Sequence, residues 1–175
     1  MEYIVLGMLM IQNMTIYELH KGFETGLSLI YAASYGSLQY AVKKLLAKNM
    51  ITFEERVENE RNKKIYHING KGVEAFFMWM MDDVDTKNIE VQMLAKVYFL
   101  GLVEDDDDKR MIIDKFLKAA TDFSAELKMV QNSINRFELT PEEWKMAKYS
   151  LRTLDYGIGN HEFAISWLHL VRSQI

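Results

Sequence analysis

The amino-acid sequence predicts a mainly α-helical protein with one small β-hairpin. Two observations support this fold class. Apolar side chains recur at three- and four-residue intervals over most of the 175 residues, as in helices with one buried face. Strand-like alternation, by contrast, is confined to one short stretch around residues 51–68. Because the helical patterns are short before the hairpin and long after it, we expect two domains, residues 1–86 and 87–175.

The first two helices are expected upstream of the hairpin. Residues 1–12 are mostly apolar, but the run is too short to cross a bilayer and has no basic leader, so we expect a buried helix. Thr15 and Glu18 have the spacing of a capping box, which predicts the start of a second helix. Gly22 and Gly26 favour the end of that helix.

A third helix is expected over residues 34–48, with Ser34 as its N-cap. Its buried face would carry Leu38, Val42, Leu45 and Leu46. The opposite face would carry Gly36, Ser37, Tyr40, Lys43 and Lys44. Small polar groups let the start of a helix approach base edges or phosphates, and lysines further along neutralise phosphates. The alternative interpretation is the solvated face of an ordinary surface helix.

The hairpin follows this helix at once. Apolar and polar side chains mostly alternate over residues 51–57, and residues 63–68 are rich in β-forming types. Its tip would present Arg61, Asn62, Lys63 and Lys64. A cationic tip can straddle a phosphate backbone or enter a minor groove, although the nearby glutamates weaken the positive field and leave an ordinary charged turn as the alternative. Three helices followed by a hairpin is the order of a winged helix-turn-helix domain.

With these elements in place, the first 80 residues or so resemble the PadR-like family of winged-helix transcriptional regulators. The motifs that carry the resemblance are Val5-Leu6-Gly7 in the first helix, Tyr17-Glu18-Leu19 in the second, Ser34 to Leu45 in the third, and Lys64 to Gly72 at the close of the wing. The chain departs from the family where Gln39 and Tyr40 replace a Tyr-Pro pair and where Ile16 replaces a glycine. Without the proline the third helix keeps a backbone donor and loses a kink, so its angle on DNA is expected to differ.

The resemblance implies a DNA-binding transcriptional regulator of the prokaryotic cytoplasm, most often a dimeric repressor of operator DNA that a small-molecule effector releases. Tyr35 and Ser37 occupy positions that resemble the family's base-contacting ones, and Lys43 and Lys44 resemble its phosphate-contacting ones. The predicted DNA-binding set is Ser34, Tyr35, Ser37, Tyr40, Lys43, Lys44, Arg61, Asn62, Lys63 and Lys64.

The charge distribution affects this expectation. The net charge is −4, with nine Lys and Arg against eight Asp and Glu in residues 1–80, and twelve against seventeen in residues 81–175. Because phosphate neutralisation provides most non-specific affinity for DNA, a nearly neutral DNA-binding half predicts weak non-specific binding that depends strongly on salt and on two-site contact. The same neutrality favours the alternative function, a winged-helix protein-interaction module without DNA binding.

Long helices and a dimer are expected in the second half. The acidic run at residues 104–108 suits the positive end of a helix dipole better than a metal site. Thr140, Pro141 and Glu143 form a capping box with a first-turn proline and predict the start of the last helix.

The last helix carries two apolar stripes. The first stripe includes the predicted dimerisation residues Trp144, Leu151, Leu154, Ile158, Ile165 and Leu168. The second stripe, Tyr149, Tyr156, Phe163 and Leu170, repeats every seven residues on a different face. Two stripes need two packing partners, and a second subunit is the natural source of one of them. The alternative is that both stripes pack within one chain.

An effector cavity is a further expectation, with a small aromatic or hydrophobic ligand held by Trp79, Tyr98, His161 and Trp167. Such residues are more often simply core. The chain has no cysteine, which excludes disulfides and thiolate metal sites and fits a reducing cytoplasm. Because the four histidines lack close ligand spacing and no nucleophile motif is present, we expect no enzyme, no cofactor, no metal and no membrane partner.

Overall fold

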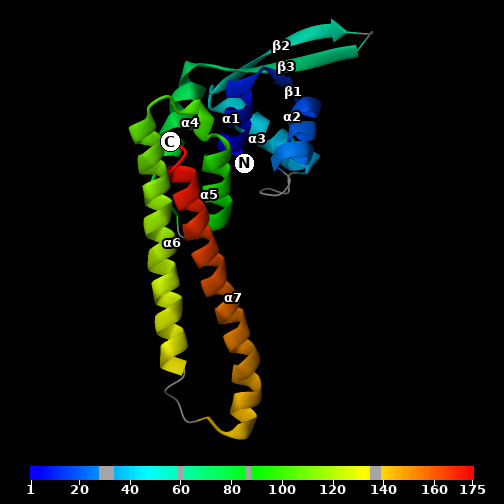
Figure 1. The fold of residues 1–175 in the computed structure, drawn as a ribbon. Coiled ribbons are helices and arrows are strands. Elements are labelled where there is room, and N and C mark those ends of the chain that lie inside the picture. The colour runs from blue at the N-terminus through cyan, green and yellow to red at the C-terminus, as the bar shows by residue number, and fades with distance from the viewer. Residues whose placement is uncertain (28–33, 59–60, 86–87, 135–138) are drawn as a thin grey trace. The chain divides into compact units, whose positions relative to one another are not determined.

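The computed structural model describes residues 1–27, 34–58, 61–85, 88–134 and 139–175, which form two compact units, Met1–Glu104 and Asp105–Ile175. The predicted fold class is confirmed, since helices dominate and one small antiparallel sheet accompanies them (Figure 1). The first compact unit extends through the helix that follows residue 87. The domain boundary predicted between residues 86 and 87 stays a prediction, because compactness does not test which segment folds or functions alone.

The described residues of the first unit form five α-helices. They are α1 (Glu2–Ile11), α2 (Ile16–Gly22), α3 (Tyr35–Ala47), α4 (Gly70–Met81) and α5 (Ile89–Tyr98). Helix α1 contacts both α3 and α4, and its residues from Ile4 to Leu9 are all buried. A helix that is apolar on all sides needs neighbours around it, so this packing confirms the buried first helix expected from the sequence.

Local hydrogen bonds start α2 and α3 where the sequence predicts. The Thr15 hydroxyl accepts from the backbone N–H of Glu18, and the Glu18 carboxylate accepts from that of Thr15. Ser34 Oγ accepts from the N–H of Ser37 at 3.2 Å. Helix α2 ends at Gly22, but the backbone continues as a π-helical turn, η1 (Phe23–Leu27), where the sequence suggested that the helix would simply end.

The sheet consists of β1 (Met14–Thr15), β2 (Ile51–Glu58) and β3 (Arg61–Ile68), in the antiparallel order β1-β3-β2. The hairpin is confirmed, but its alternating pattern does not bury one whole face. Ile51 at its base is buried, whereas Val57 near its tip is 75% exposed. The short β1 pairs only with residues 65–66 of β3, so the outer part of the hairpin projects past the helices of this unit (Figure 1).

The second unit is a hairpin of two long helices, α6 (Asp106–Ile134) and α7 (Pro141–Arg172), which contact one another along their length (Figure 1). The acidic run caps α6 as expected, because Asp105 Oδ1 accepts from the backbone N–H groups of Asp107 and Asp108 at 2.8 and 3.0 Å. The predicted capping box of Thr140 and Glu143 starts α7. Within the described residues, no helix combines the length and apolarity needed to span a bilayer.

Removing the Thr140 cap is expected to lower the free energy of unfolding by about 1 kcal/mol, because Thr140→Ala leaves a backbone donor of α7 without its acceptor. Thermal or urea unfolding measures the change. Thr153→Ala is the matched control, since its exposed hydroxyl donates to the Ser150 carbonyl inside the same helix and caps nothing. Equal loss in the two variants would contradict a capping role for Thr140.

An ion pair joins the two helices of this unit near the end of α7. Arg172 Nε lies 2.6 Å from Asp114 Oδ1, and Arg172 Nη2 donates to Asp114 Oδ2 at 3.1 Å. The hydrogen bond from Arg172 lowers the pKa of Asp114 from its ordinary value of 3.8, against the opposing effect of partial burial. This contribution to stability is therefore present above the unfolded-state pKa and is lost as pH falls through the folded-state pKa.

We expect Arg172→Gln to lower the unfolding midpoint slightly at neutral pH, with little difference from the unmodified protein once Asp114 is protonated in both. Denaturant unfolding at about pH 7 and at an acidic pH below the folded-state pKa of Asp114 checks this expectation. Lys118→Gln is the control, because Lys118 pairs with Asp122 on its own helix α6. A difference of the same size at both pH values would contradict the assigned pairing.

Candidate nucleic-acid interface

Helix α3 has one buried face and one open face. Leu38, Ala41, Val42 and Leu45 are buried on the first, whereas Leu46 is only partly covered. On the open face Ser34, Tyr35, Tyr40 and Lys43 are exposed and Lys44 is nearly half exposed. Two of the predicted contact residues also hold the start of the helix, because Ser37 Oγ donates to the Ser34 carbonyl at 2.8 Å.

Tyr35 is oriented by a neighbouring ring. Its ring meets that of His20 edge to face, with centroids 5.6 Å apart, and His20 Nδ1 lies 3.6 Å from Glu24 Oε1. Such a contact restricts the ring while leaving the phenol exposed. The first turn of α3 therefore presents a placed hydroxyl and an exposed hydrogen-bonding helix start.

The cations of α3 are not all equally available. Lys44 Nζ lies 4.7 Å from the Tyr40 ring centroid and 3.4 Å from Glu2 Oε1. Hydrogen bonds to Glu2 and Tyr40 raise the pKa of Lys44. Lys48 at the end of the helix donates to Glu2 Oε2 at 2.6 Å. Sequence reasoning did not identify Lys48, although its place four residues after Lys44 puts the two on one helix face.

The wing carries the remaining predicted contact residues. Asn62, Lys63 and Lys64 are exposed on β3; the side chain of Arg61 lies outside the described residues. Lys64 Nζ lies 4.2 Å from the Phe53 ring centroid and 3.4 Å from Glu55 Oε1. Arg56, which sequence reasoning also missed, pairs opposite Lys63 and lies 2.7 Å from Glu54 Oε1. Glutamates therefore offset part of the positive charge of the wing, as the sequence suggests.

The two apolar stripes of α7 differ in exposure. In the first stripe Ile158 and Leu168 are buried, Leu151, Leu154 and Ile165 are half-buried, and Trp144 is exposed. His161, within this stripe, stacks on Phe123 of α6 with ring centroids 5.5 Å apart. The first stripe therefore packs at least partly within its own chain. The side chains of the second stripe, Tyr149, Tyr156, Phe163 and Leu170, are between 57% and 76% exposed.

The predicted effector residues are divided between the two units. Trp79 stacks on Tyr3 with centroids 5.3 Å apart, and Tyr98 meets Phe99 edge to face; both pairs belong to the first unit. His161 and the half-buried Trp167 belong to the second. Within the part of the chain that is described, no cluster of three His, Asp or Glu side chains could hold a metal ion.

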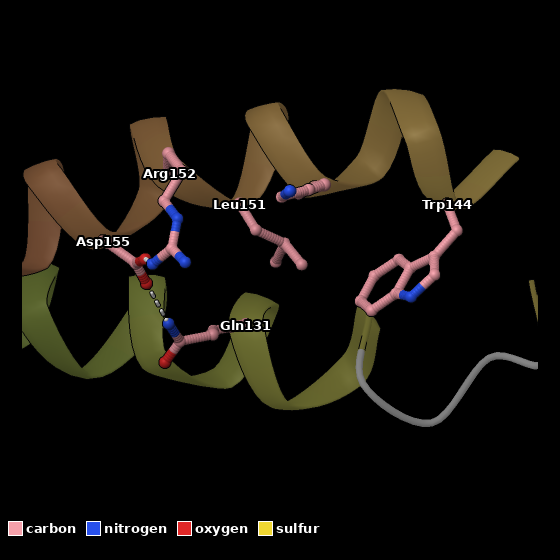
Figure 2. Close-up of a pocket in the computed structure, with 6 residues that line it drawn as sticks. Gln131, Trp144, Leu151, Arg152 and Asp155 are labelled. Carbon is pink, nitrogen blue, oxygen red and sulfur yellow. Dashed lines mark hydrogen bonds and ion pairs between the residues drawn. The ribbon is translucent and has the colours of Figure 1, made fainter.

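A groove of about 600 Å³ lies between α6 and α7 and contains none of the predicted effector residues. It is lined by Gln131, Trp144, Lys148, Leu151, Arg152 and Asp155 (Figure 2). Asp155 accepts from Gln131 Nε2 at 2.7 Å and from Arg152 Nη1 at 2.9 Å. The lining combines the apolar side chains of Trp144 and Leu151 with two cations, Lys148 and Arg152, of which Arg152 is paired with Asp155. Apolar surface together with a cation suits a small aromatic anion.

Taken together, the first unit is a winged helix-turn-helix domain and the second is a long helical hairpin.

No family model matches the chain, and no curated protein matches it. Among solved structures, PadR of Bacillus subtilis in complex with operator DNA is 17% identical, covers 99% of this chain and 97% of its own, and has a TM-score of 0.45. Smu.1604c of Streptococcus mutans UA159 is 24% identical over 98% of each chain, with a TM-score of 0.47. The PadR-like transcriptional regulator BC1756 of Bacillus cereus is 24% identical over 99% of this chain and 94% of its own, with a TM-score of 0.44. The chain is thus similar to these proteins over nearly its full length, at low identity.

Proposed function

We propose that this protein is a dimeric, DNA-binding transcriptional regulator that represses its operator and is released by a small-molecule effector. The observation that carries the proposal is the open face of α3, which presents Tyr35, Tyr40 and Lys43 to solvent while the opposite face belongs to the core. In this arrangement the start of α3 reads base edges in the major groove, and the wing lies on the adjacent backbone or in the minor groove. A prokaryotic, cytoplasmic setting belongs to the same proposal.

The dimer is proposed to form through the second stripe of α7. Tyr149, Tyr156, Phe163 and Leu170 are exposed large apolar or aromatic side chains at heptad spacing, the pattern by which one helix packs on another. A symmetric pair of subunits brings two winged-helix units to one duplex, so the operator is expected to have two-fold symmetry. The first stripe, predicted from the sequence to dimerise, would then contribute mainly at its exposed end, around Trp144.

The effector is proposed to be a small aromatic or hydrophobic compound, with an aromatic carboxylate as the class that the groove around Trp144 favours. Lys148 and Arg152 would face its carboxylate and the indole would cover its ring. The set Trp79, Tyr98, His161 and Trp167 remains the alternative prediction for this ligand.

Binding of the purified protein to duplex DNA from its own promoter region tests the function. The measurement is made at several salt concentrations with random duplex as competitor, and then repeated with a series of aromatic carboxylic acids. Selective binding by a dimer, weakened by one of the acids, is the expected result. No selective binding at low salt, together with an empty selection from random duplexes, would favour the protein-interaction module.

A further inference from the structure

We propose that Glu2 is an internal competitor for DNA phosphate: it partly neutralises Lys44 and Lys48 at the end of α3 and so limits the protein's affinity for any duplex. This inference rests on the proposed DNA binding and adds to it a residue that controls how strongly non-specific DNA is held. Glu2 lies in α1, outside α3 and the wing, and it is not among the DNA-binding residues predicted from the sequence.

The contacts place one carboxylate between two lysines. Glu2 Oε2 accepts from Lys48 Nζ at 2.6 Å, and Glu2 Oε1 lies 3.4 Å from Lys44 Nζ. Each carboxylate oxygen therefore has its own cation. Helix α1 begins at Glu2 and enters the core with buried Ile4 and Val5, and it packs on α3. The backbone that carries the carboxylate is thus anchored to the helix that carries the lysines.

Exposure distinguishes the acid from the cations. The side chains of Lys44 and Lys48 are 46% and 52% exposed, whereas that of Glu2 is only 22% exposed. A DNA phosphate can therefore approach both ammonium groups. It then also lies near the negatively charged carboxylate of Glu2, which is less exposed than the two lysines. The trio carries a net charge of +1 where the two lysines alone would carry +2. Desolvation opposes ionisation of Glu2, yet hydrogen bonds from Lys48 and Lys44 lower its pKa overall, so the carboxylate is charged at neutral pH.

The size of the effect follows from counterion release. Each additional neutralised phosphate steepens the dependence of log K on log salt by about 0.9. We take a variant without the charge of Glu2 and the unmodified protein to bind DNA equally well near about 1 M salt. One additional effective positive charge on the protein then raises its affinity for DNA at about 0.15 M salt by about fivefold per winged-helix unit. Because phosphate contacts carry no base information, random and operator duplexes should both gain.

The test compares the unmodified protein with Glu2→Gln, which keeps the shape of the side chain and removes its charge. Glu74→Gln is the matched control: it makes the same change in net charge at an exposed position of α4, in the same unit. Binding to a random duplex and to the selected duplex is measured across a salt series. We expect Glu2→Gln to bind both more tightly with a steeper salt slope, and Glu74→Gln to behave like the unmodified protein.

Repeating the comparison in a Lys44→Gln, Lys48→Gln background tests the route of the effect. Without the two lysines no phosphate is neutralised at this place, so Glu2→Gln should no longer steepen the salt slope, and only the loss of direct repulsion by the carboxylate remains. A salt slope that steepens as much without the two lysines as with them overturns the proposal, and so does equal binding by Glu2→Gln and Glu74→Gln. If Glu2→Gln and Glu74→Gln bind equally well, the unmodified protein still binds DNA, so the proposed function survives although this inference fails. If no variant binds any duplex at low salt, the proposed function fails and this inference fails with it.

Circular dichroism and thermal unfolding check that each variant is folded. Should Glu2→Gln unfold, Glu2→Asp replaces it, since aspartate keeps a negative charge at the start of α1 and withdraws the carboxylate by one methylene. An intermediate gain in affinity is then expected, and no gain counts against the proposal.

Discussion

Replacing Lys43 and Lys44 together by glutamine is expected to reduce duplex binding by a factor on the order of 10³ at about 0.15 M salt. The variant loses two phosphate contacts in each of two subunits, which makes the slope of log K against log salt shallower by about 3.6. If the variant and the unmodified protein bind equally well near 1 M salt, this change in slope corresponds to a loss of affinity on the order of 10³ at about 0.15 M. Both side chains lie on the open face of α3, so the helical circular dichroism signal and the dimer mass should not change. Fluorescence anisotropy over a salt series measures the loss.

The matched control for this variant is Lys118→Gln with Lys145→Gln, which removes the same charge from exposed positions of α6 and α7. Unchanged DNA binding by the α3 double variant, or equal loss in the control, would show that the assigned face of α3 does not contact DNA. The single variants add a finer comparison. Lys43→Gln should cost at least as much affinity as Lys44→Gln, because Glu2 already offsets part of the charge of Lys44.

Phe163→Glu is expected to convert the dimer into a monomer. Phe163 lies in the second stripe of α7 and is 70% exposed in the single chain, so the substitution removes little from the core of one subunit. In the dimer it would place a carboxylate from each subunit within an apolar contact, which costs several kcal/mol unless the charge is paired. Sedimentation equilibrium should report the monomer mass, and the salt slope of DNA binding should fall to about half.

Met78→Glu provides the control, because Met78 is similarly exposed, at 63%, but belongs to α4 of the first unit and not to the stripe. It should remain dimeric with the same affinity for DNA. If Phe163→Glu keeps the dimer mass while retaining its helical signal, the second stripe is not the interface, and the first stripe around Trp144 becomes the better candidate.

Features decided by neighbours in the chain were predictable from the sequence. Thr15, Ser34 and Thr140 each accept from a backbone N–H three residues away, so residue type and spacing are enough to place the helix starts. The same holds for the hairpin, whose pairing follows from two adjacent β-forming runs. The two stripes of α7 were also visible, since heptad spacing is a property of one helix.

Tertiary structure decided how those pieces are used. Periodicity shows that α7 has two apolar stripes, but only packing shows that His161 meets Phe123 of α6 and that Phe163 is left exposed. Val57 belongs to the alternating run of β2 and is nevertheless exposed, because a strand face is buried only where the fold places something against it.

The sequence by itself determined the helix caps, the order of the elements, the hairpin and the residue types on the open face of α3, because each depends on atoms a few positions apart. Only the tertiary structure decided that Glu2 meets Lys48, that α7 leaves its second stripe exposed, and that Gln131 and Asp155 meet in a groove. These contacts join residues 24 to 46 positions apart. The physical reason is that such pairs exist only after helices have packed, and no local spacing encodes which side chains the packing will bring together.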